Sequence, residues 1–264
     1  MTSHQLDPIR PATRSRSRAG VLRGLSLPAI LTTALGAAAC TSTPRVPAGT
    51  GLTSLQGAPE TVAVAREILE PHAVALSEVQ MLVATCVRRE TIAATGAHRI
   101  SDGPLFVRRA PATTLFRPSG TRRLQILENE TTRLVLDASR RHATRWTYAV
   151  NPRALAGVAA ILVAVDFLAQ AFVVESAGPF EEEPALQQVT FIPSPDAGLA
   201  TVERLEIVFD PDEAVPVGLR VMGRDGAVVD YELNTPTLDP VWRNPEARFT
   251  LDVPPNFKIS EQQG

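Results

Sequence analysis

The sequence is poor in the residues that build covalent frameworks or metal centres. Its 264 residues include two cysteines and four histidines. Two cysteines exclude a disulfide framework, and the scattered histidines lack a second histidine or cysteine at the spacing of a zinc site. We therefore expect no metal and no other cofactor. Cys86 lies in an apolar stretch, 81–87, and is interpreted as a small buried residue and not as a reactive thiol.

The sequence also lacks the short motifs that carry common enzyme chemistry. It has no Gly-x-Ser-x-Gly elbow, no His-Glu-x-x-His, no glycine-rich phosphate loop and no dinucleotide-binding fingerprint. Residues 181–183, three glutamates, are interpreted as a solvated loop. Asp210, Asp212 and Glu213 are interpreted as part of a turn, because the twelve-residue spacing of a calcium loop is missing. We expect a protein that is not an enzyme, and a hydrolase with an unrecognised site is the alternative.

The first 40 residues have the order of a secretory signal. Five arginines precede a charge-free apolar stretch, 24–39, which ends in small residues directly before Cys40. This stretch is shorter than the roughly 20 residues that a membrane-spanning helix needs. A cysteine after small residues resembles a bacterial lipobox, whose cysteine is acylated and becomes the N-terminus, although Ala37 stands where leucine is usual. Plain secretion with cleavage after Ala39, and an uncleaved anchor, are the alternatives.

The charge of the chain argues against nucleic acid as a partner. Residues 1–39 hold five arginines and Asp7 of the chain's 26 basic and 28 acidic residues, so the rest carries a net charge of −6. A mildly acidic body without a basic patch is not expected to bind nucleic acid. Residues 41–59 are rich in Thr, Ser, Pro, Gly and Ala, as in a flexible linker. We therefore divide the chain into a signal peptide (1–39), a flexible tether (40–59) and a folded domain (60–264).

Two segments of this domain are predicted to be helical. Over 62–76 apolar residues recur every three to four positions, and Pro71 is expected to kink or stop the helix. Residues 153–172 are almost uniformly apolar, with Asp166 and Gln170 as the polar side chains after the first residue. The unbroken apolar run is about a dozen residues long, too short to span a bilayer. A helix that is apolar on all sides must be buried or lie over an apolar cavity, so we expect one or two short helices covering the concave face of a sheet.

The remainder is predicted to be a series of antiparallel strands. From about residue 77 the hydrophobic period is two, and turn residues separate short runs. Leu124, Ile126 and Glu128 are expected to share one face of their strand. Asp225-Gly226 predicts a hairpin. The expected strands are 80–90, 105–109, 124–128, 133–137, 145–150, 189–192, 203–210, 218–222, 228–233 and 249–253.

Several motifs along these strands resemble a known family. Residues 103–111, Gly-Pro-Leu-Phe-Val-Arg-Arg-Ala-Pro, are similar to a strand motif of LolA, the periplasmic carrier of lipoproteins. Residues 248–257, Arg-Phe-Thr-Leu-Asp-Val-Pro-Pro-Asn-Phe, resemble the closing motif of that family. The stretches that stand between them in the expected order are 171–174, 189–193, 205–210 and 221–226. The resemblance covers residues 62–260.

The LolA/LolB resemblance implies a fold, a ligand class and candidate site residues. The fold is mainly β (α+β), a single curved antiparallel sheet forming an incomplete barrel that is lidded by short helices. Its apolar cavity receives acyl chains, which burial holds at roughly 0.8 kcal/mol per CH₂. Arg109 stands at the functional arginine that ties the helical lid to the sheet in that family. Arg108 is a rival, because Arg-Ala-Pro replaces the family's Arg-Pro.

Each of these candidate residues also has a plain structural interpretation. Arg109 could be an exposed arginine on an edge strand, and the apolar candidates could be ordinary core. The candidate cavity residues are Leu105, Val107, Leu124, Ile126, Ile161, Leu162, Phe167 and Leu168.

A lipid anchor departs from LolA itself, which is soluble, and resembles LolB, the outer-membrane receptor that takes cargo from the carrier. Thr41 follows Cys40, and in lipoproteins of the enterobacterial type the absence of Asp there implies export to the outer membrane. We expect an envelope protein, lipid-anchored in the outer membrane and facing the periplasm. Its expected partners are acyl chains of lipids or lipoproteins, the membrane and other envelope transport proteins. The alternative is a structural or scaffold lipoprotein that binds a protein partner.

Overall fold

A computed structural model describes residues 51–119, 124–148, 168–169, 171–199 and 201–263. The signal peptide, Cys40 and most of the apolar segment 153–172 lie outside these described residues, as do three of the candidate cavity residues, Ile161, Leu162 and Phe167.

The described residues are mainly β. The first turn, η1, spans Gly51–Ser54 and precedes the helix α1, Pro59–Leu76. A second short turn, η2, spans Glu246–Phe249. The strands are β1 (Gln56–Gly57), β2 (Met81–Ile92), β3 (Ala97–Arg108), β4 (Thr113–Phe116), β5 (Leu124–Asn129), β6 (Thr132–Asp137), β7 (His142–Thr147), β8 (Phe172–Phe180), β9 (Glu183–Pro193), β10 (Val202–Phe209), β11 (Gly218–Gly223), β12 (Val228–Leu238) and β13 (Lys258–Gln263).

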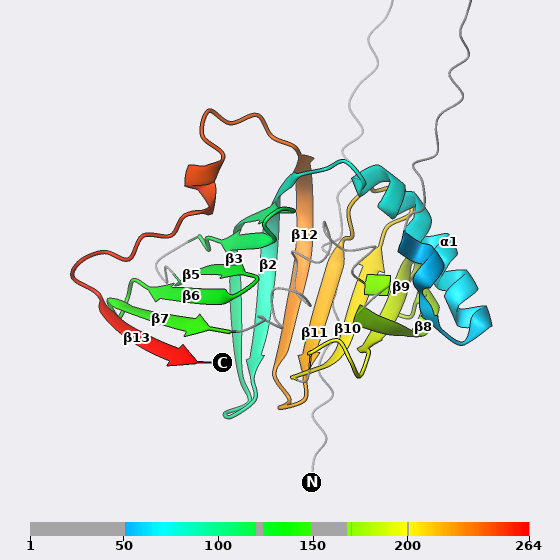
Figure 1. Cartoon of the computed structure of the whole chain (residues 1–264), viewed down its shortest axis with the longest axis horizontal. Helices are drawn as coiled ribbons and strands as arrows, with labels where there is room; N and C mark the ends of the chain where they lie inside the picture. The colour runs from blue at the N-terminus through cyan, green and yellow to red at the C-terminus, as the bar shows by residue number, and fades with distance from the viewer. Residues whose placement is uncertain (1–50, 120–123, 149–167, 170, 200, 264) are drawn as a thin grey trace, which may run out of the picture. The chain divides into compact units, whose positions relative to one another are not determined.

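The thirteen described strands form one open sheet in the order β1-β8-β9-β10-β11-β12-β2-β3-β4-β5-β6-β7-β13. Two antiparallel meanders, β2–β7 and β8–β12, are joined where β12 pairs with β2, in a register that places Tyr231 opposite Arg88. The two outermost strands pair in parallel, β1 with β8 and β13 with β7. Figure 1 shows the strands changing direction across the sheet, so that β5–β7 run across the view and β10–β12 run up it. The prediction of a mainly β, largely antiparallel sheet is confirmed.

Strand alternation assigns the two faces of this sheet. On β2, Leu82, Ala84 and Cys86 are buried and point to what we call the inner face, where Leu105 and Val107 of β3 join them in the largest apolar cluster. Side chains of successive residues point to opposite faces of a strand. Intervening residues therefore pack on the outer face, where a smaller cluster contains Phe106, Leu115 and Phe249, with Met81, Val83, Leu127, Trp242 and Leu251 packed against it.

Helix α1 packs on one end of the sheet, beside β8 (Figure 1). It begins with Pro59 in the first turn, where the missing N–H of proline costs no hydrogen bond. Its buried residues recur at the predicted spacing: Val62, Ala65, Leu69, His72, Ala73 and Leu76. Pro71 lies inside the helix and does not stop it, since helical backbone continues to Leu76. Leu52 and Leu55 also belong to the core, although they fall in the range 40–59 that we expect to be a tether.

One strand was predicted wrongly, and four described strands, β1, β4, β8 and β13, were not predicted. Over 249–253 the chain leaves η2 and continues without regular structure, because Phe249 turns inward onto the outer-face cluster. The last strand, β13, has exposed residues on both faces. It pairs along one side only, with β7, and therefore shows no apolar alternation. β1 has two residues, too few to show an alternating pattern in the sequence. Phe172, expected to end a helix, begins β8.

Candidate functional site

Arg109 connects the end of α1 to the sheet. Its Nε donates a hydrogen bond to the carbonyl oxygen of Val79 at 2.7 Å, and its Nη2 donates to the carbonyl oxygen of Leu76, the last residue of α1. Its backbone N–H donates to the carbonyl oxygen of Gln80 at 2.9 Å. The last carbonyl groups of a helix lack partners within the helix and carry partial negative charge. A guanidinium at this place therefore satisfies them and fixes the direction in which the chain leaves α1.

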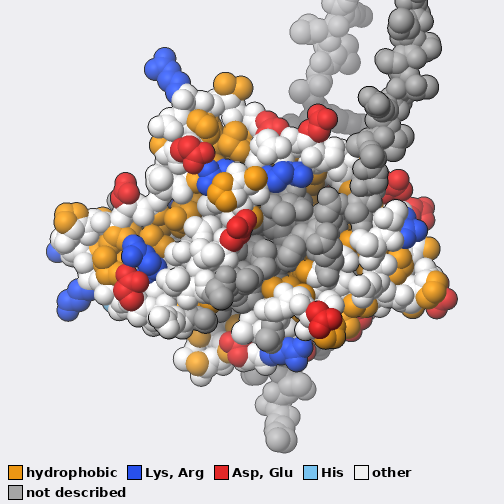
Figure 2. All heavy atoms as spheres, in the orientation of Figure 1, with side chains coloured by type: hydrophobic (Ala, Val, Ile, Leu, Met, Phe, Trp, Pro, Cys, Tyr) orange, Lys and Arg blue, Asp and Glu red, His pale blue; other side chains and the backbone are white. Residues whose placement is uncertain are grey.

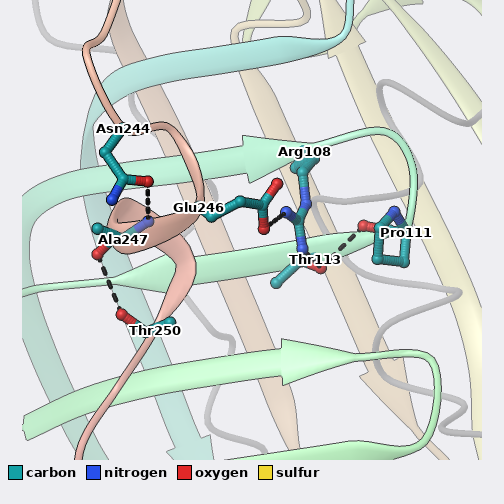
Figure 3. Close-up of polar contacts among 7 residues, drawn as sticks. All are labelled: Arg108, Pro111, Thr113, Asn244, Glu246, Ala247 and Thr250. Atoms are coloured by element: carbon teal, nitrogen blue, oxygen red, sulfur yellow. Dashed lines mark hydrogen bonds and ion pairs between the residues drawn. The ribbon is translucent and has the colours of Figure 1, made fainter.

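Arg108, the rival candidate, contacts a different element. Its Nη1 lies 2.6 Å from Oε2 of Glu246 in η2, and its Nη2 donates to Oγ1 of Thr113 at 3.3 Å (Figure 3). Its guanidinium also lies over the ring of Phe249, 4.8 Å from the centroid. Arg108, the last residue of β3, and Arg109, which follows it, thus attach two segments that are far apart in the sequence. Arg109 attaches α1, and Arg108 attaches η2.

Short-range hydrogen bonds shape η2 so that Glu246 reaches Arg108. Oδ1 of Asn244 accepts a hydrogen bond from the backbone N–H of Ala247 at 3.2 Å, and the hydroxyl of Thr250 donates to the carbonyl oxygen of Ala247 at 3.1 Å (Figure 3). Pro245 precedes the turn, and its fixed φ suits a helical start. The loop between β12 and β13 therefore has a defined conformation.

The described cavity candidates lie in the core. Leu105, Val107, Ile126 and Leu168 are at most 5% exposed, and Leu124 is half-buried and packs against the same apolar cluster. None of these five residues lines the cavity on the inner face or the hollow on the outer face that are described below. Their role as cavity residues stays a prediction.

The inner face instead holds a cavity of about 200 Å³, which we call the inner cavity. Both meanders contribute to its wall, since β2 and β5 lie on one side of the β12–β2 pair and β10 and β11 on the other. Its lining residues are Arg88, Glu128, Tyr148, Thr201, Val202, Val221, Gly223, Asp225, Ala227, Val229 and Tyr231.

Arg88 is the most deeply buried charge of this cavity. It is 3% exposed, its Nη1 lies 3.0 Å from Oε2 of Glu90, and its guanidinium lies 5.7 Å from the ring centroid of Tyr231. Burial lowers the pKa of Arg88, but Tyr231 and Glu90 outweigh it, so that the pKa is raised. Burial also raises the pKa of the Tyr231 phenol. At neutral pH the cavity wall therefore presents a charged guanidinium beside a neutral phenol.

A second ion pair of the inner face joins Glu128 of β5 to Arg133 of β6. Nε of Arg133 lies 2.9 Å from Oε1 of Glu128, and the two side chains are nearly buried. The guanidinium of Arg133 also lies over the ring of Trp146, 5.1 Å from its centroid. Because buried charges are stable only when paired and hydrogen-bonded, these contacts explain how a largely apolar face contains four charged side chains: Arg88, Glu90, Glu128 and Arg133.

The inner face is therefore amphiphilic along the strand direction. On β2 the buried row Leu82, Ala84, Cys86 continues directly to Arg88. Four residues of strand separate Ala84 from Arg88, which corresponds to about 13 Å. Leu82, Ala84 and Cys86 belong to the filled core and do not line the inner cavity, whose wall has Val202, Val221 and Val229 as apolar side chains.

Cys86 is chemically quiet. Its side chain is fully buried, and burial raises the pKa of the thiol to about 12. The thiolate is the reactive form of cysteine, so the interpretation as a buried apolar residue agrees with the structure. Across the described residues no cluster of three or more His, Cys, Asp or Glu side chains is arranged to hold a metal ion. None of the helices among them has the length and apolarity that crossing a membrane requires.

The sequence prediction found part of this site. Glu128 was expected on the face of Leu124 and Ile126, and it is buried there, in register with Arg133. Arg88 and Tyr231 were not singled out. The signal that could have found Arg88 is the alternation of residues on β2, which places Arg88 on the same face as the buried Cys86.

Known proteins resemble this chain in fold at low sequence identity. A LolA superfamily protein from Nitrosomonas europaea has 10% identity and a TM-score of 0.37, over 71% of this chain and 98% of that one. The lipoprotein LppX of Mycobacterium tuberculosis has 11% identity and a TM-score of 0.36, over 70% and 99%. MucB has 13% identity and a TM-score of 0.36, over 72% of this chain and 63% of MucB.

A LolA superfamily protein is thus among the structural neighbours. All three TM-scores lie below 0.5, so neither family membership nor function follows from them. No protein-family model and no curated protein sequence matches the chain.

Proposed function

We propose that this protein is a membrane-anchored carrier or receptor of the cell envelope that binds lipids or lipoproteins through their acyl chains. The observation that carries the proposal is the amphiphilic inner face. Val202, Val221 and Val229 give the inner cavity an apolar part of its wall, and Arg88 and Glu128 provide polar contacts. Each buried methylene group of an acyl chain contributes about 0.8 kcal/mol without directional contacts, so a carrier can hold chains of differing length.

The anchor in this proposal is the lipid on Cys40. Residues 41–59 would give the folded domain reach from the membrane surface, and Thr41 would direct the protein to the outer membrane, facing the periplasm. Its partners would be the acylated cargo, the membrane and other envelope transport proteins. No metal or organic cofactor is needed, because apolar burial supplies the binding energy.

The test is the binding of a fluorescent fatty-acid probe to the full chain, with displacement by unlabelled fatty acid. Val221→Phe places a larger side chain in the wall of the inner cavity and should weaken binding at least about tenfold, the effect of losing about 1.4 kcal/mol. Val74→Phe is the matched control, because Val74 is 48% exposed on α1, and it should bind like the parent.

Two results would refute the carrier proposal. One is binding by the parent that never exceeds that of an unrelated protein. The other is equal binding by Val221→Phe and the parent, which would place the ligand elsewhere. A protein that co-purifies with a parent chain unable to bind acyl probes would support the scaffold alternative.

A further inference from the structure

The loop between β12 and β13 forms a second hollow, on the outer side of the sheet. This hollow, which we call the outer hollow, has a volume of about 540 Å³. Figure 2 shows hydrophobic side chains beside basic and acidic ones in the region of this loop, at the upper left. Its lining residues are Arg117, Val241, Trp242, Arg243, Asn244, Ala247 and Arg248.

The loop is fixed to the outer face by aromatic packing. The ring centroid of Trp242 lies 6.0 Å from that of Phe106 and 6.4 Å from that of Phe249. The guanidinium of Arg108 lies over the ring of Phe249 and binds Glu246. Aromatic pairs in this range of distances are attractive beyond the burial of their area. The outer hollow therefore exists before any ligand arrives.

The acidic residues at the start of the loop and in η2, Asp239 and Glu246, bind groups of the sheet. Oδ1 of Asp239 accepts hydrogen bonds from the backbone N–H groups of Gln80 and Met81, both at 2.8 Å. Glu246 is bound to Arg108. Both carboxylates are thus used to attach the loop to the sheet, and neither is among the residues that line the hollow.

The three arginines of the hollow, in contrast, form no ion pair with any described residue. Arg117 donates from Nη2 to the carbonyl oxygen of Thr250 at 3.3 Å, while its Nε is buried and has no hydrogen-bond partner among the described residues. Burial, and then the charge of Arg248, lower the pKa of Arg117. Like charges held this close repel each other, and an anion placed between them would be attracted to both.

An unusually exposed apolar residue adjoins these charges. Val241 is 100% exposed and precedes Trp242, over whose ring the guanidinium of Arg248 lies at 5.7 Å from the centroid. Tryptophan and arginine beside an exposed aliphatic side chain are the combination found where proteins enter the headgroup region of a bilayer. The chain as a whole has a net charge of −2, so an anionic surface would attract this loop more than the rest of the molecule.

We propose that the outer hollow docks on an anionic membrane surface, with lipid phosphates between Arg117, Arg243 and Arg248 and the Val241 and Trp242 side chains in the headgroup layer. This contact differs from both the lipid on Cys40 and the acyl chain in the inner cavity. It would hold the folded domain on the bilayer in one orientation, with the loop between β12 and β13 toward the lipid.

The test uses the full chain carrying Cys40→Ala, so that no lipid anchor contributes, and vesicles of phosphatidylcholine with or without phosphatidylglycerol. Trp146→Phe is added so that Trp242 is the reporting tryptophan, because the chain has two. The emission of Trp242 should shift to the blue with anionic vesicles and not with neutral ones. Arg117→Gln, Arg243→Gln and Arg248→Gln should each weaken vesicle binding about fivefold.

Two controls separate docking from misfolding and from general charge. Val241→Ser changes a fully exposed side chain, cannot disturb the core, and should reduce the blue shift. Arg204→Gln removes one positive charge from β10, on the other meander, and should leave binding unchanged. A Trp242 emission that ignores anionic vesicles, or equal binding by the parent and the variant with all three arginines replaced, would overturn the proposal.

Two soluble competitors distinguish the sources of negative charge. If inorganic phosphate alone shifts the Trp242 emission and abolishes vesicle binding at millimolar concentration, the hollow is a small-anion site and the docking proposal is wrong. If poly-glutamate shifts the emission but vesicles do not, the partner is an acidic peptide and the proposal is equally wrong. These measurements do not involve the fatty-acid probe, so docking and the carrier function can fail independently.

Discussion

The guanidinium of Arg109, the residue directly after β3, donates to the carbonyl oxygen of Leu76, the last residue of α1. This contact joins the one α-helix whose bounds the described residues define to the centre of the sheet. The LolA resemblance predicted that Arg109 ties a helical lid to the sheet, and the role of α1 as that lid stays a prediction.

Arg109→Ala should loosen α1 more than it disturbs the sheet. Hydrogen bonds from a charged donor contribute about 1.5–3 kcal/mol when buried. Because the Arg109 side chain is half-buried, we expect a loss of about 1–2 kcal/mol in the free energy of unfolding by urea. Amide hydrogen exchange should accelerate over 59–79. Arg108→Ala is the comparison, and it should accelerate exchange around η2 instead. Equal protection of α1 in both variants would contradict this assignment.

The stability of the protein should fall in mild acid because of His72. This residue is buried in α1, with its ring centroid 4.5 Å from that of Phe209 and its Nδ1 3.3 Å from the carbonyl oxygen of Ala214. Burial lowers the pKa of His72 below its ordinary value of 6.5, against smaller opposing effects of Ala214 and Asp210. The unfolded chain therefore binds the proton more readily, so this contribution is complete above pH 6.5 and is lost as the pH falls below it.

The corresponding measurement is the urea midpoint at several pH values between 7.5 and 5. His72→Gln keeps an amide donor near Ala214 and cannot be protonated in this range, so its midpoint should fall less steeply with acid than that of the parent. His98→Gln, at an exposed position of β3, should keep the parent's slope. Identical slopes for His72→Gln and the parent would show that another group is responsible.

Removing one member of the buried pair Arg88–Glu90 should lower the free energy of unfolding more than replacing both members does. Arg88→Met leaves Glu90 with Arg99 at 3.9 Å as its remaining ion-pair partner among the described residues, and removing one member of a buried pair costs about 3–5 kcal/mol. The double variant Arg88→Met with Glu90→Gln should recover part of that loss. Unfolding by urea gives both numbers, and a double variant less stable than the single one would argue against a simple pair.

The anchor can be tested directly by intact mass spectrometry of the protein purified from membranes. The mature chain should begin at Cys40 and be heavier by its acyl groups, and Cys40→Ala should lose membrane association. A bare chain that begins near residue 40, or an uncleaved one, would remove the receptor-like part of the proposal and leave a soluble carrier or a scaffold.

The elements that the sequence predicted well are those whose pattern arises locally. In α1 the spacing from Val62 to Leu76 reflects one buried helical face, and in β3 the alternation of Leu105, Phe106 and Val107 reflects two clusters on opposite faces. Neither requires knowledge of distant residues. The order of the strands within each meander also follows from short turns, such as Asp225-Gly226 between β11 and β12.

The elements that escaped prediction depend on distant partners. β13 is a strand because the open edge of β7 accepts it in parallel, and its own residues carry no apolar period. Phe249 belongs to an alternating stretch but is drawn into a turn by Phe106 and Trp242. The inner cavity requires Arg88 and Tyr231 to lie opposite each other. The residues around either one give no sequence signal that predicts this pairing.

The pairing of β12 with β2 has a consequence for how the binding surface comes into being. It connects residues separated by more than a hundred positions along the chain, and such contacts form late because a long loop must close first. Each meander can be assembled from its own hairpins, but the inner cavity takes residues from both. The inner cavity is thus complete only after this long-range pairing has formed. A polypeptide that ends before β12 would have neither the β12–β2 pairing nor the inner cavity.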